Sequence, residues 1–131
     1  MKYRDLNITK KFLDENPDAI FVFGDNDHRT GYGGAAILRD HPQAYGFITK
    51  RAPDNMDLSF YRPDDFKFKF LSQAIELQIY IEKNKDKIFY FSKLGAGLAN
   101  RYQIWEKIIK DGLIKYFSDY TNVVFLWEEN I

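Results

Sequence analysis

The chain has 131 residues, enough for one domain with a substantial hydrophobic core and little room for a second. Hydrophobic residues make up 45% of the sequence and aromatic residues 18%, which argues against a disordered chain. Nineteen basic and nineteen acidic residues cancel, so we expect no strong general affinity for nucleic acid, although a local basic patch could still exist.

The first half of the chain alternates predicted helices and strands. Residues 9–15 predict a short helix, which the Asn16-Pro17-Asp18 turn ends. Residues 19–23 form a continuous apolar run, typical of a strand buried on both faces. The pattern then predicts a glycine-rich loop, a helix and a second strand, at 24–34, 35–40 and 45–49 respectively.

The second half follows the same alternation after an irregular stretch at 51–62. Pro63, Asp64 and Asp65 predict a helix start, because proline and acidic residues favour the first turn. The helix is expected to reach about Asn84, with apolar residues at helical spacing at Phe66, Phe70, Ala74, Leu77 and Ile81. A strand is predicted at 88–91 and a second glycine-containing loop at 92–101. A helix follows, whose apolar face comprises Ile104, Trp105, Ile108, Ile109 and Leu113, and the last element is a strand at 122–127. This order predicts an α/β fold with helices on both sides of a sheet in which several strands are parallel.

The sequence carries no signal for a membrane or an oxidising compartment. It has no cysteine, so disulfides, thiolate metal sites and a cysteine nucleophile are excluded. The N-terminus is polar, which predicts no signal peptide, and no apolar run approaches the ~20 residues of a membrane span. We therefore expect a soluble, cytoplasmic protein with no membrane partner.

The first loop begins after the buried strand and contains four glycines in eleven residues: Gly24, Gly31, Gly33 and Gly34. Open α/β sheets bind ligands at the carboxyl ends of their strands. Glycines there let a ligand approach the backbone, and the amides at a helix start, here near Ala35, suit phosphate. The alternative is that the glycines only shape a turn. The loop is neither a Walker A loop nor the dinucleotide fingerprint.

The second loop repeats this arrangement and includes Gly95, Ala96, Gly97, Leu98 and Asn100. Two such loops predict one shared cleft for a phosphate-bearing ligand, provided that the two preceding strands are parallel neighbours.

Several polar residues are further candidates. Asp25 and Asn26, after the first strand, could hold a ribose or a base, or could cap a turn. Lys50 ends the second strand and could face the cleft, although an ordinary surface lysine is the commoner case. His28 and His41 lack metal-ligand spacing, so we expect no metal. Phe66, Phe68 and Phe70 are expected in core or edge packing, and Trp105 in the core.

Four segments in this order resemble macrodomains, within the branch of the terminal ADP-ribose glycohydrolase and the antitoxins that remove ADP-ribose from DNA. They are the strand ending in Asn26 (19–26), the glycine turn (31–37), the strand end Ile48-Thr49-Lys50 (45–51), and the Gly-x-Gly-Leu loop with its tryptophan-bearing helix (89–105). The resemblance implies a single macrodomain-like domain over 1–131, a three-layer α/β/α sandwich with a mixed, partly parallel central sheet.

The resemblance also implies a ligand and a chemistry. ADP-ribose, free or attached to a macromolecule, would lie between the two loops, with its diphosphate on amides of 33–35 and 95–98. Lys50 would attack or hold the distal ribose, which a neutral amine can do. The family's acid after Gly-x-Gly-Leu is Ala99 here, followed by Asn100, so acid–base help would have to come from Asp25 or Asp27. A non-catalytic module that binds or sequesters a nucleotide metabolite therefore remains the alternative, and neither version needs a cofactor.

Overall fold

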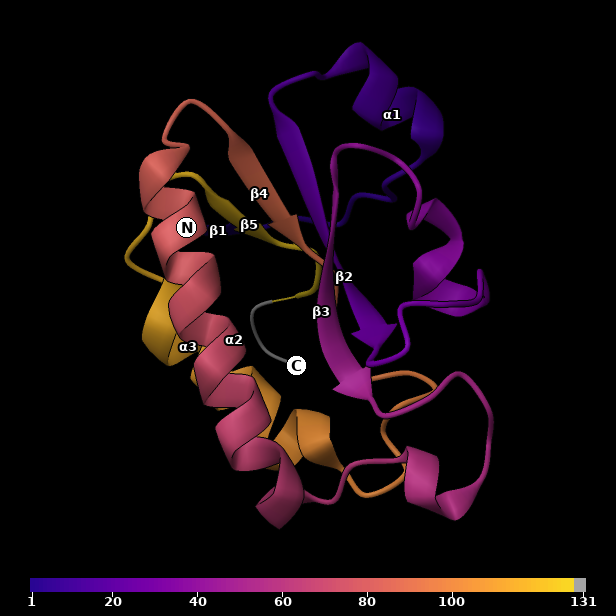
Figure 1. The fold of residues 1–131 in the computed structure, drawn as a ribbon. Helices are drawn as coiled ribbons and strands as arrows, with labels where there is room; N and C mark the ends of the chain where they lie inside the picture. The colour runs from indigo at the N-terminus through magenta and orange to yellow at the C-terminus, as the bar shows by residue number, and fades with distance from the viewer. Residues whose placement is uncertain (129–131) are drawn as a thin grey trace.

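The computed structural model describes residues 1–128 and has a five-stranded sheet in the order β1-β5-β4-β2-β3 (Figure 1). All four strand pairs are parallel, so the sheet is not mixed, as the resemblance implied, but parallel throughout the described strands. The strands are β1 (Lys2–Tyr3), β2 (Ala19–Asn26), β3 (Ala44–Lys50), β4 (Ile88–Phe91) and β5 (Val123–Phe125). The helices are α1 (Lys10–Glu15), α2 (Pro63–Lys83) and α3 (Lys110–Phe117), with short 3₁₀ helices at Gly34–Leu38 and Asp57–Ser59 and a π turn at Trp105–Ile109.

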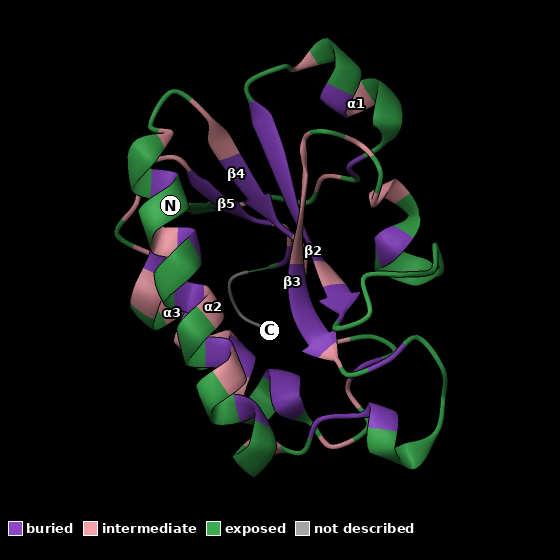
Figure 2. Cartoon of the chain, viewed as in Figure 1, coloured by how far each residue is buried: buried purple, intermediate pink, exposed green. Residues whose placement is uncertain are grey.

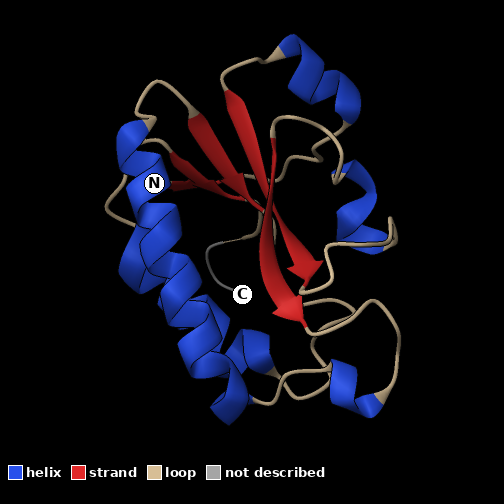
Figure 3. Ribbon diagram, viewed as in Figure 1, coloured by secondary structure: helices blue, strands red, loops and turns tan. Residues whose placement is uncertain are grey.

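Helical elements cover both faces of the sheet, as predicted (Figure 3). Successive residues of β2 point to opposite faces. Ile20 and Val22 join the cluster that contains the buried faces of α2 and α3, whereas Phe21 and Phe23 join a smaller cluster with Leu13 of α1. Both faces of the sheet are therefore buried, which explains why β2 is almost entirely apolar up to Phe23 (Figure 2).

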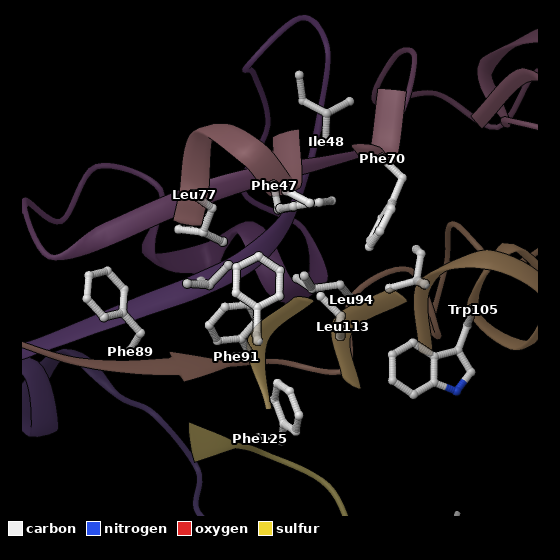
Figure 4. Packing of buried hydrophobic residues seen from close by; sticks show 14 of the residues in the cluster. Phe47, Ile48, Phe70, Leu77, Phe89, Phe91, Leu94, Trp105, Leu113 and Phe125 are labelled. Carbon is white, nitrogen blue, oxygen red and sulfur yellow. The ribbon is translucent and has the colours of Figure 1, made fainter. Parts of the chain in front are cut away.

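The larger cluster is rich in aromatic side chains that meet between the sheet and α2–α3 (Figure 4). The ring centroids of Phe47 and Phe70 are 5.7 Å apart, and those of Phe91 and Phe125 are 5.7 Å apart. Trp105 is 4% exposed and its ring lies edge-on to that of Trp127, which agrees with its predicted place in the core.

Helix α2 follows the sequence pattern closely. Pro63 occupies its first turn with Asp64 and Asp65, and all five residues predicted for its apolar face are buried. Phe68 differs, because it is 84% exposed rather than packed in the core or at an edge. Its position on the helix turns it away from the face that carries Phe66 and Phe70.

Three other sequence expectations change in the structure. The first loop does not start at Gly24, because Gly24 and Asp25 still pair with Phe47 and Ile48 of β3 and extend β2 to Asn26. The helix expected at 35–40 is a 3₁₀ helix at Gly34–Leu38. The two-residue strand β1 was not predicted; it is too short to show a pattern and exists through its pairing with β5.

Within residues 1–128, no helix is both long enough and apolar enough to cross a bilayer.

Candidate functional site

A cleft of about 360 Å³ lies at the carboxyl ends of the central strands. Strand β2 pairs in parallel with β4 on one side and β3 on the other, so the segments that follow these three strands emerge at one edge of the sheet. The strands that precede the two glycine loops, β2 and β4, are therefore parallel neighbours, as a shared cleft requires. Its volume is in the range of ~300–1,000 Å³ that is usual for small-molecule sites.

Most of the predicted site residues line this cleft: Gly24, Asp25, Asn26, Gly31, Gly33, Gly34, Ala35, Lys50, Gly95, Gly97 and Leu98. The wall also contains residues that sequence reasoning did not select: Thr30, Ala36, Arg39, Thr49, Pro53, Ser92, Lys93, Leu94 and Ala99.

Two predicted residues, Ala96 and Asn100, are absent from the wall. The Asn100 side chain accepts a hydrogen bond from the Trp105 amide at 3.0 Å and donates to Glu106 at 2.6 Å, so it ties the second loop to the first residues of the π turn. Ala96 packs against the hydrophobic core. In the structure both residues therefore contact the rest of the protein rather than the cleft.

The glycines of the first loop differ in what their backbone requires. Gly31 and Gly34 have positive φ angles of 88° and 56°, which glycine adopts without strain. Gly33 has φ −79° and ψ 149°, an extended conformation open to any residue, and a Cβ atom built on it would meet nothing within 4 Å. The fold therefore does not explain a glycine at position 33.

The second loop shows the same division. Gly95 has φ +76°, and a Cβ atom there would lie 2.6 Å from Cδ1 of Ile109. Gly97 is outside the positive-φ group, and a Cβ atom on it would again meet nothing within 4 Å. The first loop thus has two glycines that its backbone requires, and the second loop has one. Each loop also has one glycine on the cleft wall, Gly33 or Gly97, that the fold does not need.

Asp25 is a buried carboxylate that pairs with two arginines, Arg29 and Arg39. Its Oδ2 accepts a hydrogen bond from Nη1 of Arg29 at 3.1 Å, and its Oδ1 accepts hydrogen bonds from Nη1 of Arg39 and from the Asn26 amide. The Asp25 side chain is 2% exposed. Both carboxylate oxygens are therefore occupied, and Asp25 is poorly placed to act as a general acid or base.

Arg39 links this carboxylate to the first loop. Besides Asp25, it donates to the carbonyl oxygens of Thr30 and Gly31, each at 2.9 Å. Asn26 supports the same turn by donating to Thr30 O at 2.8 Å and accepting from the His28 amide at 3.0 Å. These contacts fix the loop against the end of β2. The sequence offered no signal for Arg39, because its partner Asp25 is 14 residues away.

Lys50 lines the cleft at the end of β3. Its ammonium donates to the backbone carbonyl of Asp54 at 2.8 Å and lies 4.5 Å from the centre of the Phe60 ring. Burial lowers the pKa of Lys50; the nearby Asp54 charge raises it and that of Arg101 lowers it. Lys50 therefore belongs to the cleft wall, and its lowered pKa favours the neutral amine more than the pKa of an ordinary lysine does.

The hydroxyl of Ser92, at the end of β4, is the one buried side-chain polar atom within residues 1–128 that has no hydrogen-bond partner. Ser92 belongs to the cleft wall, between the end of β2 and the second loop. An unsatisfied buried hydroxyl costs about 1–3 kcal/mol, so an orphan at this place suggests that a bound group satisfies it.

Acidic and metal-binding groups are scarce at the site. Asp25 is the one carboxylate among the described residues of the wall, and Ala99 is 6% exposed. The part of the chain that the structure describes contains no cluster of three or more His, Cys, Asp or Glu side chains suited to a metal ion. His41 instead contacts Asp14 at 2.8 Å, away from the cleft.

Comparison with known proteins yields one match. Residues 3–100 match the model of a family described as a family of unknown function, DUF7831. No curated protein and no solved structure matches the chain. The matched segment begins in β1 and ends at Asn100 in the second glycine loop, and it contains every residue of the cleft wall. The chain belongs to the family of unknown function DUF7831.

Proposed function

We propose that the cleft binds ADP-ribose or a related nucleotide, with its diphosphate between the two glycine loops. The observation that carries this proposal is the pair Gly33 and Gly97. Neither needs to be glycine for its backbone conformation, neither is crowded, and both face the cleft. A ligand that touches the backbone at both positions explains the missing side chains.

The chemistry of the wall supports a phosphate-bearing ligand. Backbone amides of glycine loops suit phosphate oxygens, and Lys50 and Lys93 add positive charge. The orphan Ser92 hydroxyl supplies a further hydrogen bond for a phosphate or a ribose. The resemblance to macrodomains narrows this ligand class to ADP-ribose.

Lys50 favours a second candidate, hydrolysis of an ADP-ribose linkage on a macromolecule. A neutral Lys50 amine would form a bond to the anomeric carbon of the distal ribose, while the bond from that carbon to the macromolecule breaks and the released atom takes a proton. The resulting glycosylamine would then open its ribose ring: the bond from the anomeric carbon to the ring oxygen breaks, the ring oxygen takes the proton of the lysine nitrogen, and a Schiff base to Lys50 forms. Water would hydrolyse this Schiff base to free ADP-ribose and the amine. The lowered pKa of Lys50 is in the right direction for this step.

Binding without hydrolysis is nevertheless better supported. Protonation of the leaving atom needs an acid, but Asp25 is held by two arginines, and Asp27 is outside the cleft wall and pairs with Lys69 at 3.2 Å. The position that carries an acid in the glycohydrolase is Ala99. We therefore rank first a module that binds or sequesters the nucleotide. We propose that it acts in the cytoplasm, because the chain has no cysteine and cytoplasmic proteins do not rely on disulfides.

Calorimetry tests this function. ADP-ribose should give a measurable heat of binding, larger than that of AMP or ribose 5-phosphate, which lack the diphosphate. Gly97→Glu should abolish the heat, because it places bulk and negative charge in the cleft. The proposal fails if ADP-ribose does not bind the wild type, or if it binds Gly97→Glu as tightly.

An enzymatic assay decides between the two candidates. Hydrolysis predicts release of ADP-ribose from modified protein or nucleic acid by the wild type and none by Lys50→Ala, with the melting temperature of the variant retained. If the wild type binds ADP-ribose but releases none from a modified macromolecule, the protein is a binding module and not a hydrolase.

A further inference from the structure

The chain folds back on itself directly after Lys50. Lys50 and Phe60 form an isolated antiparallel β-bridge, and the Arg51 amide donates to the Ser59 carbonyl oxygen at 2.9 Å. The residues between β3 and this bridge, 51–59, form what we call the Lys50 turn, which extends beyond the end of β3 (Figure 1). Pro53 of this turn lines the cleft, so the turn stands at the Lys50 end of the ligand site.

The side chain of Asp54 closes the Lys50 turn. Its Oδ1 accepts hydrogen bonds from the Met56 amide at 3.0 Å and from the Ser59 hydroxyl at 2.5 Å. Ser59 is buried, so its hydroxyl needs a partner within the protein, and Asp54 supplies it. Bonds to an ionised carboxylate are the stronger kind, and those from Ser59 and Met56 lower the pKa of Asp54. The carboxylate that closes the turn is therefore ionised at neutral pH.

The closed turn presents two groups to the Lys50 side chain. The backbone carbonyl of Asp54 accepts a hydrogen bond from Nζ at 2.8 Å, and the centre of the buried Phe60 ring lies 4.5 Å from Nζ. An amine can donate to this carbonyl in its charged or its neutral form, because both carry N–H groups. The ring takes the place of water beside the amine, and burial is the main cause of the lowered pKa of Lys50.

We propose that Asp54 is a positioning residue for Lys50: its side chain folds the Lys50 turn, whose backbone carbonyl and Phe60 neighbour hold the lysine amine at the cleft. This role deepens the proposed function and rests on it, since a held amine matters when a ligand in the cleft meets Lys50. For hydrolysis, a nitrogen that is already held loses less freedom on reaching the anomeric carbon. For binding alone, a held ammonium loses less rotamer freedom on donating to a ribose or phosphate oxygen.

The charge of Asp54 can be separated from its role in the turn. Asp54 and Arg101 are the charged groups that act on Lys50, and they shift its pKa in opposite directions. Arg101 lies 4.0 Å from the centre of the Phe60 ring and pairs with Asp57 at 3.5 Å. Asp54→Asn removes the charge but keeps an oxygen that can accept both hydrogen bonds, whereas Asp54→Ala removes the charge and the acceptor. The difference between the two variants therefore measures the turn alone.

Competitive labelling of amines tests the positioning role without any ligand. The wild type and both Asp54 variants are treated with trace acetic anhydride over a pH series, and mass spectrometry gives the rate at each lysine. The pH of half-maximal rate at Lys50 should be higher in Asp54→Ala than in Asp54→Asn by about 0.5, because the released amine meets water. Lys85, an exposed lysine beyond the end of α2, is the internal control and should behave alike in every protein.

Ser59→Ala provides a second variant that keeps the Asp54 charge. It removes one of the two donors that close the turn, so the pH of half-maximal rate at Lys50 should rise above that of the wild type. Thermal unfolding checks that each labelled protein is folded. Equal Lys50 values in Asp54→Asn and Asp54→Ala, or a wild-type value in Ser59→Ala, would overturn the positioning role.

Calorimetry with ADP-ribose on the same variants separates this role from the proposed function. If both hold, Asp54→Asn should bind ADP-ribose about 2- to 10-fold more tightly than Asp54→Ala, which must order the lysine on binding. If ADP-ribose does not bind the wild type but the Lys50 values still differ, the proposed function fails and Asp54 still positions Lys50. If ADP-ribose binds and the Lys50 values agree, the positioning role is wrong and the proposed function stands.

Discussion

Alanine substitutions at Gly95 and Gly97 separate a glycine that the fold needs from one that a ligand needs. The two residues are two positions apart in the same loop. At Gly95, a methyl group would lie 2.6 Å from Cδ1 of Ile109, and the backbone has a positive φ. At Gly97, a methyl group would meet no atom within 4 Å and would stand at the cleft wall.

The expected stability changes have opposite signs. Gly95→Ala costs about 1–2 kcal/mol for the left-handed conformation and about 1–3 kcal/mol for overcrowding against Ile109. Gly97→Ala is expected to stabilise by about 0.4–1 kcal/mol, because alanine loses less conformational freedom on folding. The two costs at Gly95 add to about 2–5 kcal/mol. At roughly 3–5 °C per kcal/mol for this chain length, Gly95→Ala therefore lowers Tm by roughly 6–25 °C, and Gly97→Ala raises it slightly.

For ligand binding, the substitution at Gly97 is expected to matter, whereas for stability the substitution at Gly95 matters more. A methyl group on Gly97 would keep a phosphate away from the backbone and remove at least one charge-assisted hydrogen bond. Such a bond contributes about 1.5–3 kcal/mol, so Gly97→Ala should weaken ADP-ribose binding by about 10- to 150-fold.

Thermal unfolding and calorimetry on the two variants and the wild type measure both quantities. A Gly97→Ala variant that is stable and binds ADP-ribose like the wild type would show that no ligand approaches this backbone, and the argument from the uncrowded glycine would be refuted. A Gly97→Ala variant as unstable as Gly95→Ala would contradict the open environment itself.

Two further predictions concern stability. A Cβ atom at Gly46 would lie 2.5 Å from Nη1 of Arg29 and 2.6 Å from Oδ2 of Asp25, so Gly46→Ala should force this ion pair apart and destabilise the fold by about 1–3 kcal/mol in denaturant unfolding; an unchanged midpoint would contradict the close packing. Burial and the hydrogen bond to Glu82 raise the pKa of Tyr120 to about 12. Because the folded pKa exceeds the unfolded value of about 10, this contribution to stability is complete below pH 10 and disappears between about pH 10 and pH 12. Unfolding measured over that range should therefore show a shallower loss of stability for Tyr120→Phe than for the wild type, and equal slopes would count against the shifted pKa.

The elements of the fold were largely readable from the sequence, because their signals are local. The apolar face of α2 repeats with the period of a helix, and Pro63 with two acids defines its start. The run before Gly24 is apolar on both faces, which requires a strand covered on both sides. The two glycine loops, Lys50 and a cleft that they share were also predictable, because ligand sites in such sheets lie at the carboxyl ends of strands.

The sequence by itself determined most of the helices and strands and the place of the two glycine loops, because those choices depend on neighbours within a few positions. The tertiary structure decided what each site residue does. Asp25 is held by Arg39 from 14 positions away, Gly95 is needed because Ile109 packs on it, and Gly97 is free because nothing does. Contacts between distant segments depend on strand order and packing, and local periodicity carries no information about either.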